Sequence, residues 1–224
     1  MNTIRIAGML GVMLAATPAL AQDDTGIKAG DVLLRARAIV VTPNERSGDI
    51  LPAFPGERVS ISDSVMPEVD ITWMATDNIG FELIASTTKH KADGRTGTTG
   101  SIGELASTWV LPPTLTAQYH FNPRGTVRPY VGAGVNYTIF WDEKASTGLT
   151  GAVGPTKVHM KDSFGWAAQA GIDIDLSKKF FLNLDVKYID IDTTARLDTT
   201  AAGRQSVKLN IDPLVFGIGF GVRL

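Results

Sequence analysis

Apolar and polar residues alternate along short segments of this chain, and the alternation is clearest near its C-terminal end. Over residues 214–224 every second residue is apolar, from Leu214 to Leu224, and three glycines, Val215 and Arg223 stand between them. A period of two is typical of a β-strand, whose successive side chains point to opposite faces of the sheet. The pattern therefore predicts a strand with one large apolar face and one small face.

The same period recurs upstream, so eight strands are predicted. They cover residues 31–41, 65–75, 79–89, 109–121, 128–141, 163–176, 180–192 and 207–224. In the last of them the alternation changes phase at Asp212 and Pro213, which predicts a bulge. Pro112 and Pro113 cannot donate ladder hydrogen bonds, so the fourth strand is expected to bulge or fray near its start.

The connections between these strands alternate in length. Short turns are expected at residues 77–78, 122–127 and 177–179, and long loops at residues 42–64, 90–107, 142–162 and 193–206. Bacterial outer-membrane barrels have this layout, with long external loops and short periplasmic turns. The predicted fold is therefore all-β: an eight-stranded antiparallel transmembrane β-barrel with four long external loops and three short periplasmic turns.

Large aromatic residues fall near the strand ends when the apolar faces are assigned to lipid. The outer rim receives Trp109, Tyr137, Trp141, Phe164, Trp166 and Tyr188. The inner rim receives Trp73, Phe81, Tyr119, Phe121 and Phe220. Two aromatic girdles are expected where a barrel crosses the membrane interfaces. A soluble β-sandwich or a lipocalin-like barrel also alternates, but its apolar faces turn inward and carry no belts, so the membrane barrel is favoured.

The first residues have the pattern of a secretory signal peptide. Arg5 supplies a positive charge, residues 6–16 are apolar, and Ala19-Leu20-Ala21 fits a cleavage site. A transmembrane anchor is disfavoured because the apolar core is too short for a comfortable span. The prediction is a signal peptide at 1–21, an outer-membrane barrel domain at 22–224, and a location in the outer membrane of a Gram-negative cell.

Composition narrows the classes of function. The formal net charge of −2 gives no electrostatic case for nucleic acid, and without cysteine the chain has no disulfide or thiol chemistry. Of the three histidines, His90 and His159 are expected to be solvated in or beside loops, and His120 to lie near the inner rim. None lies in a nucleophile motif or at metal-ligand spacing. No enzyme activity, catalytic residue, cofactor or metal is therefore assigned.

The faces expected to point inward carry polar and charged residues of both signs. An eight-stranded barrel is only just wide enough for its own side chains, and buried charges must pair. We expect a salt-bridged plug that blocks bulk water flow, in preference to a site that recognises a solute. The predicted lumen-lining residues are Arg35, Arg37, Glu68, Asp70, Glu82, Gln118, His120, Gln169, Asp173, Asp185, Lys187, Lys208 and Asp212.

Four apolar residues in the expected loops are exposed by position, namely Phe54, Ile102, Leu105 and Leu149. They either line an apolar entrance or pack loop on loop above the barrel. Loops carry function without a periodic signal, so both alternatives stay open.

Three runs of sequence resemble the OmpW family of small outer-membrane proteins. They are LPPTLTAQYHFNPRGTVRPYVGAGVNYTIF at 111–140, LNLDVKYIDIDT at 182–193 and IDPLVFGIGFGVR at 211–223. The resemblance implies an eight-stranded barrel, a narrow and largely apolar channel for small hydrophobic molecules, and a link to stress responses.

The expected function is therefore passive uptake or efflux of small hydrophobic molecules. A narrow interior with a charged lower lumen favours a lateral exit, for which Pro112 and Pro113 mark a candidate opening. The alternative is a structural or surface-interaction barrel, whose loops bind host molecules, phage or lipopolysaccharide. Expected partners are outer-membrane lipid and lipopolysaccharide, the barrel-insertion machinery and small hydrophobic solutes, and the barrel is expected to be a monomer.

Overall fold

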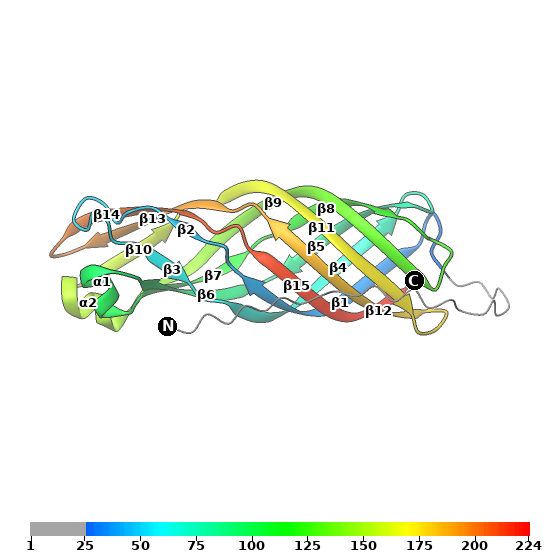
Figure 1. The fold of residues 1–224 in the computed structure, drawn as a ribbon, viewed down its shortest axis with the longest axis horizontal. Helices are drawn as coiled ribbons and strands as arrows, with labels where there is room; N and C mark the ends of the chain where they lie inside the picture. The colour runs from blue at the N-terminus through cyan, green and yellow to red at the C-terminus, as the bar shows by residue number, and fades with distance from the viewer. Residues whose placement is uncertain (1–25) are drawn as a thin grey trace, which may run out of the picture.

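The computed structural model describes residues 26–224, which form a closed antiparallel barrel of eight strands (Figure 1). The barrel strands are β1 (Val32–Thr42), β4 (Ser64–Met74), β5 (Ile79–Ser86), β8 (Thr114–His120), β9 (Val127–Ala145), β11 (Ser163–Asp175), β12 (Phe180–Ile189) and β15 (Leu214–Arg223). Their order is β11-β12-β15-β1-β4-β5-β8-β9, and β9 pairs again with β11 to close the ring. The predicted fold is confirmed, whereas the predicted signal peptide at 1–21 lies outside the described residues.

The first and last strands pair along almost their whole length. The register runs from Leu33 opposite Arg223 to Thr42 opposite Leu214. Closure gives every barrel strand a partner on both sides, which removes the open edges that a bilayer does not tolerate.

Side chains alternate between the lipid face and the lumen in the phase that the sequence predicts. The five aromatics assigned to the inner rim are all exposed, as are Tyr137, Trp141, Phe164 and Trp166 at the outer rim. Trp109 stacks on Trp141 with ring centroids 5.6 Å apart, and Tyr188 lies 5.0 Å from Trp166. Exposed rings at both ends of the apolar wall are typical of the two membrane interfaces.

The long connections, expected to be loops, are mostly strands that continue the barrel outward. This outer extension consists of β2 (Arg46–Ser47), β3 (Val59–Ile61), β6 (Thr88–Gly94), α1 (Gly97–Ile102), β7 (Glu104–Leu111), α2 (Thr147–Val153), β10 (Thr156–Met160), β13 (Asp192–Thr199) and β14 (Gly203–Asn210). One side of it is built from β3, β6, β7 and the end of β9, and the other from β10, β13, β14 and β2. The predicted strands include only the parts of β6, β7, β13 and β14 nearest the barrel, and the rest of the extension was assigned to loops because its outer faces are polar and it lacks a large apolar stripe.

Neither helix within residues 26–224 is long and apolar enough to cross a membrane.

Both predicted irregularities are interruptions between two strands. Pro112 and Pro113 separate β7 from β8, and residues 211–213 separate β14 from β15. Asp212 has a φ of 39°, in the left-handed region that non-glycine residues rarely adopt. Odd-numbered residues face inward on both sides of residues 211–213. The apolar pattern changes phase because the large apolar residues of β14, such as Leu209, face inward, whereas those of β15, such as Leu214, face outward.

Candidate functional site

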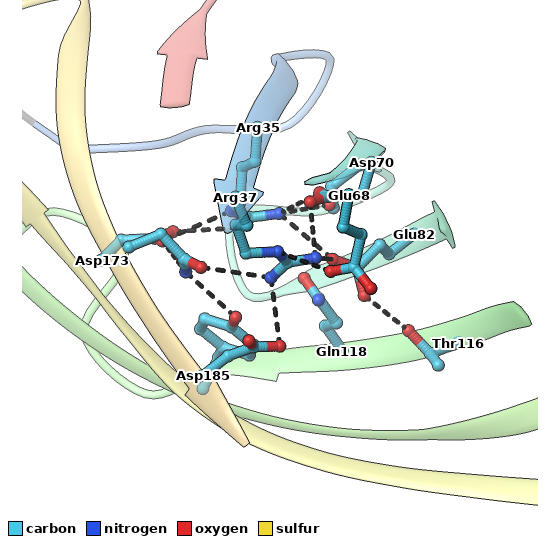
Figure 2. Close-up of polar contacts among 12 residues, drawn as sticks. Arg35, Arg37, Glu68, Asp70, Glu82, Thr116, Gln118, Asp173 and Asp185 are labelled. Atoms are coloured by element: carbon cyan, nitrogen blue, oxygen red, sulfur yellow. Dashed lines mark hydrogen bonds and ion pairs between the residues drawn. The ribbon is translucent and has the colours of Figure 1, made fainter. Parts of the chain in front are cut away.

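Two arginines of β1 form the centre of the lower lumen. They stand at alternate positions, so Arg35 and Arg37 both point inward, and the register sets them opposite Asp70 and Glu68 of β4. Arg35 binds Asp70 and, across the lumen, Asp173, with nitrogen–oxygen distances of 3.0 Å to each. Figure 2 shows the two guanidinium groups held between carboxylates from opposite walls.

Arg37 and Lys187 share a second set of carboxylates. The Arg37 guanidinium lies 2.8 Å from Glu68 and 3.1 Å from Asp185. The Lys187 ammonium donates to the same two carboxylates, at 2.7 Å to Glu68 and 2.8 Å to Asp185. Each carboxylate therefore bridges two cations, which ties β1, β4 and β12 together through the lumen.

Glu82 of β5 joins the two arginines. One carboxylate oxygen lies 3.5 Å from Arg35 and 3.3 Å from Arg37. The other accepts hydrogen bonds from Thr116 at 3.2 Å and from Gln169 at 2.6 Å. Strands from both sides of the barrel thus meet at a single side chain.

We call these eight charged residues the ionic plug: Arg35, Arg37, Glu68, Asp70, Glu82, Asp173, Asp185 and Lys187. All eight are buried. A charge removed from water is tolerated only when it is paired and hydrogen-bonded, and removal of one partner from a buried pair costs about 3–5 kcal/mol. The arrangement closes the lumen with side chains that are expensive to separate.

The small face of β15 makes room for the plug. A Cβ on Gly217 would collide with the Asp185 carboxylate, and one on Gly221 would collide with the Phe181 ring. These two of the three glycines in the last strand therefore stand where side chains of β12 cross the lumen, whereas Gly219 lies against the backbone of β1 at Ala36.

Below the plug the lumen remains filled as far as the periplasmic turns. Arg128 pairs with Asp175 at 2.6 Å. The His120 ring lies 5.1 Å from that of Tyr130 and 3.2 Å from the side-chain oxygen of Gln118. Arg128 and Tyr130 were not among the predicted lumen residues, although both share the inward phase of β9.

The structure buries every predicted lumen residue except Lys208. Val207 and Leu209 on either side of it are buried, so Lys208 points outward, opposite Thr194 of β13. Its assignment to the lumen was wrong because the apolar residues of β14 face the interior, whereas the large apolar residues of β15 face outward, so the polar positions of β14 lie on the outside. Asp212 is buried apart from the plug, where it accepts from the Ile191 amide at 3.2 Å.

An apolar cavity of about 110 Å³ lies above the plug. Glu68 and Lys187 of the plug contribute to its lining. The rest is mainly apolar, and includes Ile39, Val41, Ile84, Val110, Phe140, Leu209 and Val215.

Three of the four predicted entrance residues, Phe54, Leu105 and Leu149, line this cavity. Leu105 is 4% exposed and Leu149 6% exposed, so the expectation that they are exposed was wrong. Ile102 packs against the same apolar cluster and is absent from the described lining of the cavity. The outer extension folds these side chains inward over the barrel, which hides them from water.

His90 also lines the cavity, in contrast to the solvated position expected for it. It is 7% exposed. Its Nδ1 lies 2.7 Å from the Ser62 carbonyl oxygen and its Nε2 3.0 Å from the Thr88 hydroxyl. Both ring nitrogens are therefore engaged in a wall that is otherwise largely apolar.

The barrel wall has a gap in its hydrogen-bond ladder beside the cavity. Pairing between β5 and β8 ends at Ile84 opposite Thr114, and pairing between β6 and β7 begins at Thr88 opposite Val110. Within the described chain no strand pairing joins residues 85–87 to residues 111–113. Pro112 lines the cavity at this level, so the stretch of wall without ladder hydrogen bonds lies between the cavity and the outside of the barrel.

The sequence matches known proteins along nearly all of the described part. The model of the OmpW family matches residues 28–224. This chain belongs to the OmpW family. It is 37% identical to outer membrane protein W of Escherichia coli over 212 residues, which cover 94% of this chain and 96% of that protein. It is 38% identical to outer membrane protein W of Vibrio cholerae over 196 residues, 87% of this chain and 88% of that protein.

A solved structure shares the architecture of this OmpW-family protein. The crystal structure of OprG from Pseudomonas aeruginosa superposes with a TM-score of 0.84 at 32% identity, covering 90% of this chain and 99% of that one. These homologues are outer-membrane barrels of Gram-negative bacteria, so the predicted family and location are confirmed.

Proposed function

We propose that this OmpW-family protein is a passive channel for small hydrophobic molecules. The observation that carries the proposal is the apolar cavity directly above the ionic plug. Transfer of apolar surface from water into such a cavity is favourable by about 25 cal/mol per Å². Ions and polar solutes gain no such free energy in the cavity, and the paired side chains of the plug leave them no water-filled path. The arrangement therefore selects for apolar solutes.

The proposed route leaves the barrel through its wall. A solute enters from the outer extension and occupies the cavity. To continue to the periplasm it would have to separate buried ion pairs, at a cost of several kcal/mol for each charge left unpaired. At the gap between residues 85–87 and 111–113 there are no ladder hydrogen bonds to break. Lateral exit into the membrane is thus the less costly step.

Uptake by whole Gram-negative cells tests the function. Cells with and without the protein receive a small apolar compound and, in parallel, a polar compound of similar size. Faster uptake of the apolar compound alone is the expected result. Faster uptake of both would mean an open water path and would refute the plug. No change in either would favour a structural or surface-interaction barrel.

Replacement of Pro112 and Pro113 tests the lateral exit. The variant Pro112→Thr/Pro113→Val restores two amide donors and allows the ladder to close, so apolar uptake is expected to fall at least severalfold. The matched control is Pro129→Val in β9, an exposed proline outside the cavity lining. If the double variant and the control are both folded and the double variant takes up the apolar compound at the native rate, the lateral route is refuted, whereas the channel function is not.

A further inference from the structure

The outward face of one sheet in the outer extension is strongly basic. This sheet, built from β10, β13, β14 and β2, lies at the end of the barrel remote from the periplasmic turns (Figure 1). Exposed basic residues lie on these strands or directly beside them: Arg46, Lys157, His159, Lys161, Arg196, Arg204 and Lys208. We call this surface the basic face. The exposed acids on these strands or directly beside them are Asp162, Asp192 and Asp198.

Strand register gathers these cations into adjacent rows. The Lys161 amide donates to the Thr194 carbonyl oxygen at 3.1 Å, and Thr194 stands opposite Lys208. In the next row His159 stands opposite Arg196. Neighbouring strands lie only about 4.8 Å apart, so the positive charges of the two rows reinforce one another.

Most of this positive charge is uncompensated. Lys157, Lys161, Arg196 and Lys208 make no salt bridge to any carboxylate of residues 26–224. The other three members have partners: Arg204 pairs with Asp198, Arg46 with Asp212, and His159 approaches Glu143 at 3.9 Å.

The opposite side of the extension differs in this respect. There Lys91 pairs with Glu104 and Lys144 with Asp142, at 2.7 and 2.8 Å, and Arg95 approaches Glu45 at 3.9 Å. Within the described part of the extension, cations without a carboxylate partner are thus more numerous on the basic face than on the opposite side, where Lys89 lies 5.8 Å from the Trp109 ring instead.

The basic face borders the surface that contacts lipid. Lys161 and Lys208 both line a groove of about 390 Å³, and so does Phe164 of the outer aromatic girdle, which is 72% exposed. Lys161 precedes Phe164 by three residues, so their Cα atoms lie within about 10 Å of each other. A ligand in this groove would meet cations and the membrane interface at the same time.

Two acids also line the groove, and both already have hydrogen-bond donors. Asp162 accepts from the Tyr137 hydroxyl at 3.0 Å, and Asp192 accepts from the Asn210 side-chain amide. These hydrogen bonds orient both carboxylates but do not remove their charge, so the groove holds two acids and two lysines, and Arg196 in the adjacent row supplies the excess positive charge.

We infer that the basic face binds the phosphate groups of the glycolipid in the outer leaflet of the outer membrane. The protein resides in that membrane. Because the basic face is positively charged and borders the wall that contacts lipid, a complementary partner presents several negative charges beside acyl chains. Phosphorylated lipid A has this chemistry: its phosphates match Lys161, Arg196 and Lys208, and its chains match the apolar wall at Phe164. This inference is independent of the channel, because the basic face lies outside the barrel lumen.

The test compares two triple variants of the full protein in detergent micelles. Lys161→Gln/Arg196→Gln/Lys208→Gln removes charge from the basic face. The control, Lys91→Gln/Arg95→Gln/Lys144→Gln, makes the same charge change on the opposite side. Native mass spectrometry measures binding of bis-phosphorylated lipid A, and the slower gel migration on heating that is usual for such barrels verifies folding. The first variant is expected to bind about a hundredfold more weakly, from the typical contribution of each cation near an anionic surface, and the control as the native protein does.

Three results would overturn the inference. The first is equal binding by the two variants. The second is undiminished binding of lipid A stripped of its phosphates. The third is displacement of the lipid by inorganic phosphate or by a sulfated polysaccharide at the same concentration as lipid A, which would assign the face to free anions or to a polyanionic polymer. Loss of lipid binding in the basic-face variant alone, for phosphorylated lipid A alone, supports it.

Discussion

Replacement of Arg35 by methionine tests whether the plug is a dry, paired network. Arg35 binds Asp70 and Asp173 at 3.0 Å each, and its guanidinium carbon lies 5.4 Å from the Tyr130 ring and 5.5 Å from the Phe181 ring. Methionine keeps the packing of the aliphatic stem but removes the cation that Asp173 binds and one of the two that Asp70 binds, since Asp70 also contacts Arg37. Loss of one partner from a buried pair lowers the free energy of unfolding by about 3–5 kcal/mol. This is a large part of the total free energy of unfolding, which is roughly 5–15 kcal/mol for a typical protein.

The assay is urea unfolding of the barrel in lipid vesicles, followed by tryptophan fluorescence. Arg204→Met is the control: Arg204 pairs with Asp198 at 2.7 Å, but the two side chains are 71% and 51% exposed, so no measurable change is expected. Conversion of Asp70 and Asp173 to asparagine in the Arg35→Met background should restore part of the loss. If the free energy of unfolding of Arg35→Met lies within about 1 kcal/mol of that of the native protein, the lumen is hydrated and the plug is not a dry, paired network.

Two further perturbations address the cavity and the outer extension. Ala195→Phe places a ring in the cavity of about 110 Å³, so apolar uptake by whole cells should fall sharply while the barrel still folds; undiminished uptake would exclude the cavity from the route. Interactions with the side chain and amide of Thr99 lower the pKa of Glu57, so its contact with the start of α1 is complete above about pH 4.3 and is lost as the pH falls through the lower folded-state pKa. Hydrogen exchange at the Thr98 and Thr99 amides should show reduced protection at acid pH, and constant protection would contradict this.

The barrel was predictable from the sequence because the bilayer imposes one rule on every strand. Large apolar residues such as Phe216, Ile218 and Phe220 must face lipid at alternate positions, so the period, the faces and the closure follow from residue types alone. The inward charges were predictable for the same reason: Arg35 and Arg37 occupy the phase opposite to the lipid face.

The outer extension obeys no such rule, and the prediction failed there. Its strands have water outside and a cavity inside, so Leu105, Leu149 and His90 gave no sign in the sequence that they are buried. Lys208 was misplaced because the apolar side chains of β14 face the cavity, whereas those of β15 face lipid, and the same alternation is compatible with either arrangement. Which carboxylate pairs with which cation in the plug depends on strand register, and residue types alone do not determine register.

The pairing of β1 with β15 has a consequence for folding. Contacts such as Leu33 with Arg223 join positions at nearly the two ends of the described chain, and loop closure makes such contacts the slowest to form. Until β15 arrives, β1 and β12 each present a row of unpaired amides and carbonyls that hydrocarbon does not solvate. A chain truncated before Leu214 would therefore lose far more than an eighth of its stability. Insertion becomes an all-or-none event that is decided by the last strand to reach the membrane.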